Sequence, residues 1–151
     1  MVDHVDKKIL QALFEDGRAS VETVAEKVGL TPTPVRLRLN RLREEGVIRG
    51  YRAEVDLAKC GLELAIIVFV KLSARDRATI SAFEKRVLSI GEITECLLIS
   101  GPFDYMLKVN TPDMAGYNQT LRNQLAELPG VFGIETSFII SEVKTFSKLP
   151  W

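Results

Sequence analysis

The chain has very few of the residues from which metal sites, disulfides and catalytic centres are built. Its 151 residues include two cysteines, Cys60 and Cys96, and one histidine, His4. Two isolated cysteines and a lone histidine fit neither the spacing of a zinc site nor a disulfide framework. A glycine-rich phosphate loop and a Ser/His/Asp set are also missing from the sequence. We therefore expect reduced thiols, no metal, no cofactor and no enzyme.

Long apolar runs are missing as well. The longest, residues 64–70, is far shorter than the roughly 20 residues that a membrane helix needs. The N-terminus is charged where a signal peptide would be apolar, so we expect a cytoplasmic protein. A composition of 46% hydrophobic and 26% charged residues is typical of a globular protein with one domain or two small ones.

Charge is unevenly distributed although the formal net charge is zero. Within residues 33–52, six arginines face two glutamates, which leaves a local charge of +4. A patch of this kind can neutralise nucleic-acid phosphates. The alternative is a solvated helix face whose charges pair with one another, and charge alone does not separate the two.

Three short helices are predicted in the first 45 residues. Asp3 can cap the first helix, and Ser20 can cap a second that ends at Gly29. Only Leu30 separates that glycine from the next cap, Thr31. So short a link forces the second and third helices to cross sharply, as in a helix-turn-helix.

The third helix has two distinct faces. At 100° per residue, Val35, Leu39 and Leu42 fall within about 60° of each other and should face the other helices. The opposite face offers Asn40 for adenine and Leu37 for a thymine methyl group, as expected of a helix in a major groove. Arg38 lies between the faces and is either a DNA contact or the partner of a neighbouring carboxylate. With the flanking segments included, the residues expected to contact DNA are Thr31, Thr33, Arg36, Leu37, Asn40, Arg41, Arg49 and Arg52.

The segment after the third helix predicts a wing. Gly46 ends the helix, and residues 47–52 suggest a short hairpin whose arginines would flank the duplex. Residues 1–55 are therefore interpreted as a winged helix-turn-helix domain, followed by a linker over residues 56–61.

The hydrophobic pattern of the second half, residues 62–151, is typical of an α+β domain. Strands are predicted at 64–72, 93–100, 105–110 and 131–143, and helices at 78–88 and 113–128. The order βαββαβ is that of the ferredoxin-like fold. Its helices cover one face of the sheet, so the other face needs a partner, and a homodimer is the simplest solution.

Several segments together resemble a known family. They are 2–6 (VDHVD), 16–20 (DGRAS), 25–35 (AEKVGLTPTPV), 46–51 (GVIRGY), 101–105 (GPFDY), 128–131 (LPGV) and the terminal 143–150. In this order and spacing the chain resembles the Lrp/AsnC ("feast/famine") transcriptional regulators of bacteria and archaea. The resemblance implies double-stranded DNA as a partner, a C-terminal domain that senses a small molecule such as an amino acid, and homodimers that assemble further, often into octamers.

The resemblance also implies where an effector binds, between sensing domains. The implied effector-binding residues are Ser100, Gly101, Pro102, Phe103, Asp104, Thr136 and Ser137. Asp104 would pair with a ligand ammonium group, and Gly101 would let backbone groups approach a carboxylate. The alternative for Asp104 is a strand connection in which its carboxylate caps backbone N–H groups.

Three hypotheses for the function of the protein remain. We favour a sequence-specific transcriptional regulator that responds to a small effector and acts on a pseudo-palindromic site. The second is a multimeric chromatin-organising protein that binds DNA with little sequence preference and no specific effector. The third is an enzyme on a ferredoxin-like scaffold, for which only the fold would argue.

Overall fold

A computed structural model of the chain describes residues 1–144 and 149–151. The chain forms two compact units, one of Met1–Glu54 with Val143–Trp151 and one of Val55–Glu142. The C-terminal residues were assigned by sequence to the second domain. They group with the first unit, in which the Leu149 N–H donates to the Gln11 side-chain oxygen at 3.3 Å.

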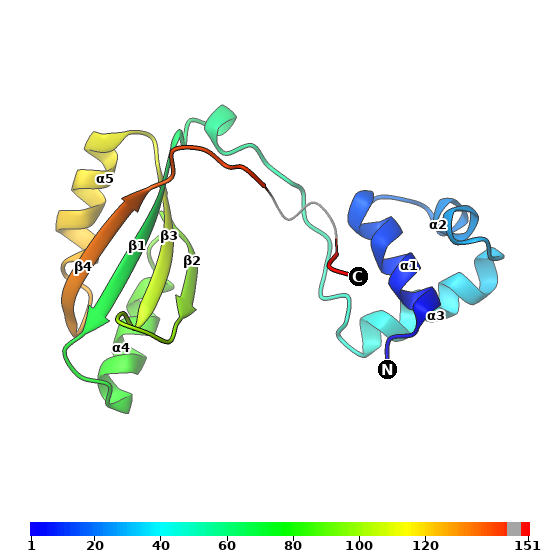
Figure 1. Ribbon diagram of the computed structural model, residues 1–151, viewed down its shortest axis with the longest axis horizontal. Coiled ribbons are helices and arrows are strands. Elements are labelled where there is room, and N and C mark those ends of the chain that lie inside the picture. Colours follow the sequence, from blue (N-terminus) through cyan, green and yellow to red (C-terminus); the bar gives the residue numbers. More distant parts are fainter. Residues whose placement is uncertain (145–148) are drawn as a thin grey trace. The chain divides into compact units, whose positions relative to one another are not determined.

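The first unit contains three helices: α1 (His4–Glu15), α2 (Val21–Val28) and α3 (Pro32–Glu44), shown in Figure 1. Asp3 and Ser20 cap α1 and α2 through side-chain hydrogen bonds, as predicted. Gly29 follows α2 with φ of 73°, and Thr31 is the N-cap residue of α3, although its side chain makes no cap hydrogen bond. The helix-turn-helix prediction is confirmed.

The predicted inner face of α3 forms part of the core of this unit. Val35, Leu39 and Leu42 are at most 3% exposed. Val35 and Leu39 pack with Ile9 of α1 and Val24 of α2 in one apolar cluster. Because these side chains fix the rotation of α3, the opposite face of the helix points to solvent.

The predicted hairpin of the wing is not formed as paired strands. Residues 46–56, all within the described part of the chain, contain no strand. The Ile48 N–H donates to the Leu42 carbonyl at 2.9 Å, and the side chain of Ile48 packs against the helical core, so this residue continues the helix end rather than a ladder. Gly50, at the expected turn of the hairpin, has φ of 158°. An isolated two-stranded hairpin this short is only marginally stable unless a third strand pairs with it.

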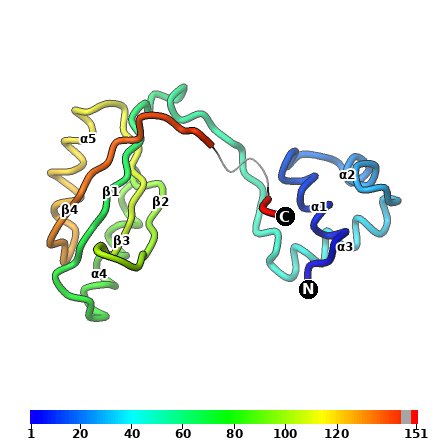
Figure 2. The backbone as a smooth tube through the Cα atoms, viewed as in Figure 1, coloured from blue at the N-terminus to red at the C-terminus, as the bar shows by residue number. Residues whose placement is uncertain are grey.

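The second unit is a four-stranded antiparallel sheet with strand order β2-β3-β1-β4. Its strands are β1 (Leu64–Leu72), β2 (Ile93–Leu98), β3 (Tyr105–Thr111) and β4 (Val131–Phe138). A short 3-10 turn, η1 (Ala58–Cys60), precedes β1. Figure 2 traces the same path as a tube, with β1 between β3 and β4. The split βαββαβ prediction is confirmed.

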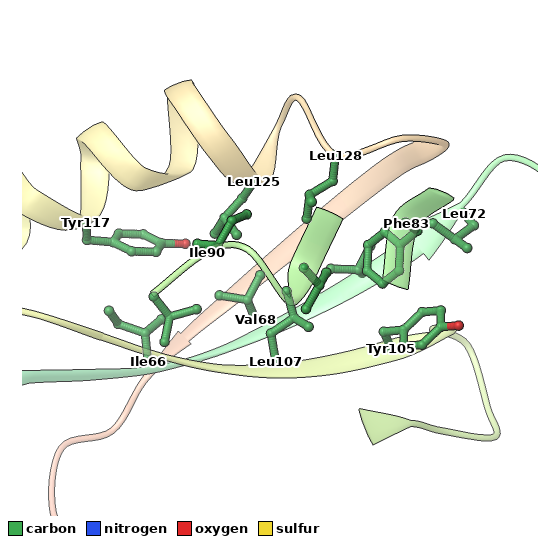
Figure 3. Packing of buried hydrophobic residues seen from close by; sticks show 13 residues of the cluster. Ile66, Val68, Leu72, Phe83, Ile90, Tyr105, Leu107, Tyr117, Leu125 and Leu128 are labelled. Carbon is green, nitrogen blue, oxygen red and sulfur yellow. The ribbon is translucent and has the colours of Figure 1, made fainter. Parts of the chain in front are cut away.

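Both helices of this unit cover the same face of the sheet. They are α4 (Arg77–Val87) and α5 (Met114–Thr120), which continues into a π-helical turn, η2 (Leu121–Leu125). Figure 3 shows Tyr117 and Leu125 over Ile66 and Val68 of β1, with Phe83 of α4 nearby. The side chains that alternate with these on the strands form the opposite, uncovered face.

The last strand is shorter than predicted. It was expected to reach residue 143 but ends at Phe138, which pairs with Ile66. The Ile139 N–H still donates to the Ala65 carbonyl at 3.0 Å, so pairing with β1 stops within a residue of Phe138. The apolar run of the sequence continues to residue 140, so local sequence preference alone does not set the end of β4.

Two further findings concern the whole described chain. None of its helices is long and apolar enough to cross a membrane. Among the same residues, no group of three or more His, Cys, Asp or Glu side chains is arranged to hold a metal ion.

Candidate functional site

The solvent face of α3 carries most of the predicted DNA contacts. Thr31, Thr33, Arg36, Leu37 and Asn40 are all exposed. Leu37 is 67% exposed, which is unusual for a large apolar side chain on a charged helix. The combination of an amide, a guanidinium and an exposed methyl-bearing side chain on one helix face suits contact with base edges.

The polar residues of this face make only weak contacts with other side chains. The Arg36 guanidinium lies 3.6 Å from the Glu22 carboxylate of α2, and both side chains are more than 60% exposed. Exposed pairs of this kind contribute little, so Arg36 can exchange its partner for a phosphate or a base. The Asn40 side-chain oxygen accepts a long hydrogen bond, 3.4 Å, from Arg43.

Arg43 was not among the predicted contacts, although it is exposed on the same helix. Its guanidinium donates to the Tyr51 hydroxyl at 3.2 Å and lies 5.9 Å from the centre of the tyrosine ring. This contact holds the segment after α3 against the end of that helix. The exposed Arg49 and Arg52 belong to the same segment. The sequence signal for Arg43 was its place in the arginine cluster.

Arg41 differs from the other predicted contacts because a buried carboxylate holds it. Its guanidinium contacts Asp6 of α1 at 2.5 Å, and Arg38 contacts the same carboxylate at 2.8 Å. Asp6 is 0% exposed. Burial by itself raises the pKa of Asp6, but the hydrogen bond from the Asp3 N–H and the Arg38 guanidinium outweigh it, so the pKa lies below its ordinary value.

Four of the predicted effector residues line one hollow. Ser100, Gly101, Phe103 and Asp104 surround a cavity of about 260 Å³ at the turn between β2 and β3, which Arg75, Leu98 and Ile99 complete. Arg75 was not predicted. Its only sequence signal is a positive charge in the loop after β1. Gly101 has φ of 129°, a conformation that disfavours other residues.

Asp104 is fixed by the protein itself. It is 6% exposed, accepts the Leu72 N–H at 2.8 Å and accepts the Arg75 Nε–H at 2.6 Å. The hydrogen bond from Leu72 lowers the pKa of Asp104 more than burial raises it, and Arg75 lowers it further. This geometry is the strand-connecting alternative considered for Asp104, with one oxygen on a backbone N–H and the other on an arginine.

The remaining predicted effector residues lie elsewhere. Pro102 belongs to the same turn but is not among the residues that line the hollow. Thr136 and Ser137 are on β4, beside Val68 and Ile67 of β1, and therefore point to opposite faces of the sheet. The Thr136 hydroxyl is hydrogen-bonded to the Tyr117 hydroxyl at 2.5 Å beneath α5. A single chain does not bring them to the hollow.

A helix-turn-helix unit joined to an α+β unit with a small hollow is the architecture of two-domain regulators that bind DNA and sense a ligand. Family profiles assign the same classes to the two parts. Residues 2–43 match the AsnC-type helix-turn-helix domain, and residues 65–149 match the Lrp/AsnC ligand binding domain. The chain belongs to the Lrp/AsnC family of transcriptional regulators.

Relatives with assigned names agree over nearly the whole chain. The proline dehydrogenase transcriptional activator of Rhizobium radiobacter is 41% identical, over 95% of this chain and 92% of the relative. The leucine-responsive regulatory protein of Escherichia coli is 37% identical, over 98% and 90%. These relatives are transcriptional regulators and not enzymes, which confirms that part of the prediction.

Solved structures share the architecture as well. A transcriptional regulator of Neisseria meningitidis in complex with L-Met has a TM-score of 0.93 and 29% identity, over 99% of this chain and 97% of that one. An AsnC family regulator from Agrobacterium tumefaciens has a TM-score of 0.91 and 30% identity, over 98% and 96%. The present chain is thus a transcriptional regulator with a DNA-binding unit and a ligand-binding unit.

Proposed function

We propose that the exposed side of α3 reads the edges of bases in the major groove, and that the arginines of the following segment hold the DNA backbone. The observation that carries this proposal is the sorting of α3 into a face buried to at least 97% and a face with an exposed Leu37 between polar side chains. A reading helix needs this arrangement, because its rotation must be fixed while its base-contacting groups remain free.

Matched arginine and asparagine variants test this assignment. The cognate duplex is first selected from random sequence with the full chain, and binding is then measured by fluorescence anisotropy at one fixed salt concentration. Arg36→Ala and Asn40→Ala should each weaken cognate binding by about 1–3 kcal/mol and random-DNA binding by less. Arg49→Ala should weaken both equally. Arg122→Ala, which removes an exposed arginine of the sensing unit, should change neither.

The same titrations separate sequence-specific regulation from DNA packaging. Specific regulators bind their sites about 10³-fold or more tighter than random DNA. A wild-type chain that bound every duplex with nearly equal affinity would support the chromatin-organising alternative. Equal losses for Arg36→Ala on cognate and random DNA would assign that residue to phosphate contact.

The hollow beside the β2–β3 turn is the proposed effector site, and a free amino acid is the proposed effector. Arg75 offers a guanidinium for the α-carboxylate, with the backbone at Gly101 close by, while Leu98, Ile99 and Phe103 supply apolar walls for a side chain. The L-Met bound to the Neisseria meningitidis regulator makes methionine the first compound to test. Thr136 and Ser137 would contribute only from a second copy of the chain.

A thermal-shift screen of the twenty amino acids at constant salt tests the effector proposal. At least one amino acid should raise the melting temperature, since a ligand that binds only the folded state stabilises it. Arg75→Gln should reduce that shift, and Arg77→Gln, two residues away at the start of α4 and outside the lining of the hollow, should not. No shift with any amino acid would refute the proposal.

We further propose that the uncovered face of the sheet joins two copies into a homodimer, and that dimers assemble further, up to octamers. Ile67, Phe69 and Met106 lie on that face, next to Leu97 on β2, which is 49% exposed. An apolar sheet face of this kind is covered in a stable protein. Sedimentation should show dimers or larger species, and Ile67→Arg should dissociate them. A wild-type monomer would refute the proposal.

We also propose a cytoplasmic location for the protein.

A further inference from the structure

The first turn of α1 presents two carboxylates to the reading helix. Asp3 is the N-cap residue of α1 and Asp6 its third residue. The two form a reciprocal pair, in which the Asp6 N–H donates to the Asp3 carboxylate at 2.8 Å and the Asp3 N–H donates to the Asp6 carboxylate at 2.9 Å. These bonds fix both carboxylates in position, because each carboxylate accepts the other residue's backbone N–H.

Two arginines of α3 converge on this pair. Arg38 donates to Asp3 at 2.5 Å and to Asp6 at 2.8 Å, and Arg41 donates to the second oxygen of Asp6 at 2.5 Å. The Arg38 and Arg41 side chains are 30% and 41% exposed, whereas that of Arg36 is 62% exposed. Arg41 also lies 3.9 Å from Glu45, so carboxylates flank it on two sides.

A buried carboxylate holds its arginines far more firmly than an exposed one does. Asp6 is 0% exposed, so loss of Arg38 or Arg41 would leave a buried carboxylate with only one of its two arginine partners. Glu22, the partner of Arg36, is 65% exposed and loses little when its arginine leaves. Three arginines on one helix are therefore held with unequal strength.

We propose that Asp6 is a positioning residue for sequence discrimination, which withholds Arg38 and Arg41 from the DNA phosphates and so leaves base contact to the outer face of α3. The inference rests on the proposed DNA-reading role of that helix. It assigns Arg41, which the sequence alone placed on the reading face, to the protein's own framework.

The physical consequence concerns non-specific binding. Each arginine that reaches a phosphate strengthens binding to every DNA sequence alike and steepens the salt dependence of log K by about 0.9. Contacts to base edges, by contrast, strengthen binding only to the correct sequence. Holding two arginines on Asp6 therefore lowers affinity for random DNA more than it lowers affinity for the cognate site, and the ratio between the two rises.

The test measures cognate and random-duplex affinity of the full chain over a range of salt concentrations, with circular dichroism and melting temperature as checks of folding. In Asp6→Asn the amide keeps the size of the side chain and removes its charge. We expect random-DNA affinity at moderate salt to rise at least tenfold, the salt slope to steepen by about 1–2 per reading helix, and the cognate-to-random ratio to fall. A folded Asp6→Asn chain with unchanged slope and ratio would overturn the proposal.

Two arginine variants decide the matter independently, including the case in which Asp6→Asn does not fold. Arg38→Gln should leave the salt slope unchanged, while Arg49→Gln, at a proposed phosphate contact, should reduce it by about 0.9 per reading helix. If Arg38→Gln reduced the slope as much as Arg49→Gln, Arg38 would be a DNA contact and the role of Asp6 would be refuted. If neither variant changed the slope or the cognate affinity, the reading surface itself would be wrong.

Discussion

Replacement of Asp104 perturbs the connection between the ends of β1 and β3. One carboxylate oxygen accepts the Leu72 N–H at 2.8 Å and the other accepts the Arg75 Nε–H at 2.6 Å. The Asp104 backbone is bonded as well, since its N–H donates to the Val70 carbonyl at 2.9 Å. The Asp104 carbonyl also accepts the Ile99 N–H at 2.9 Å. Asp104→Ala removes the two side-chain bonds and leaves these two backbone bonds in place.

The expected loss of stability follows from the burial of each partner. A buried N–H left without an acceptor costs about 1–3 kcal/mol. The Arg75 side chain is 69% exposed and can turn to water, so its share is about 0–1 kcal/mol. The total is about 1–4 kcal/mol, and for a unit of this size each kcal/mol changes the melting temperature by roughly 4–8 °C, so we expect Asp104→Ala to lower it by roughly 4–30 °C.

The assay is a comparison of melting temperatures at one protein and salt concentration, with and without the best amino acid from the screen. The Asp104→Asn side chain can still accept the Leu72 N–H but no longer neutralises the charge of Arg75. Its melting temperature should therefore fall by less than half as much as that of Asp104→Ala. Arg75→Gln should lower the melting temperature least of the three. A melting temperature for Asp104→Ala within about 2 °C of the wild type would refute the reasoning, because the freed N–H would then be satisfied in another way.

The dependence on pH has a definite sign. The folded pKa of Asp104 lies below its ordinary value of 3.8, so the ionised carboxylate contributes stability above that value. This contribution is lost as the pH falls below about 4, through the folded pKa. The difference in melting temperature between the wild type and Asp104→Asn should therefore be constant above pH 5 and narrow below pH 4. A difference that widened on acidification would contradict the assignment.

Two further predictions concern single contacts. A Cβ at Gly130 (φ 73°) would lie 2.3 Å from a threonine methyl group of α4, whereas a Cβ at Gly46 (φ 70°) would meet nothing within 4 Å. Thermal unfolding should therefore show that Gly130→Ala lowers the free energy of unfolding by about 1–3 kcal/mol more than Gly46→Ala does. Equal losses of stability would contradict the close approach at Gly130. Trp151 is the only tryptophan of the sequence, and the Lys7 Nζ lies 5.5 Å from the centre of its ring. Lys7→Met removes this cation–π contact and should make the Trp151 ring more accessible to quenching by acrylamide. Lys8→Met should leave the quenching unchanged.

The elements of the fold that depend on neighbouring residues could be predicted from the sequence. Asp3 and Ser20 cap helices because a side-chain oxygen meets an N–H three residues later, a contact that needs no distant partner. Strand β1 has the predicted bounds, Leu64–Leu72, because its apolar, β-branched run is bounded by charged or polar residues. The buried face of α3 followed from the helical period alone.

The parts of the site that depend on distant residues could not. Arg41 was predicted to face DNA because the helical projection places it outward, yet Asp6, 35 positions earlier, holds it. Arg75 is an ordinary loop residue in the sequence, and only the fold places it beside Asp104, 29 positions away.

The sequence by itself thus determined the order of the helices and strands, the helix-turn-helix, the family and the set of side chains that α3 turns outward. Tertiary structure alone decided how charge is distributed over that helix and which residues surround the hollow beside the β2–β3 turn. The physical reason is that caps and periodicity arise from contacts within one or two turns of chain. The state of an arginine or a carboxylate depends instead on which opposite charge the fold brings within hydrogen-bond distance, and on whether water still reaches it.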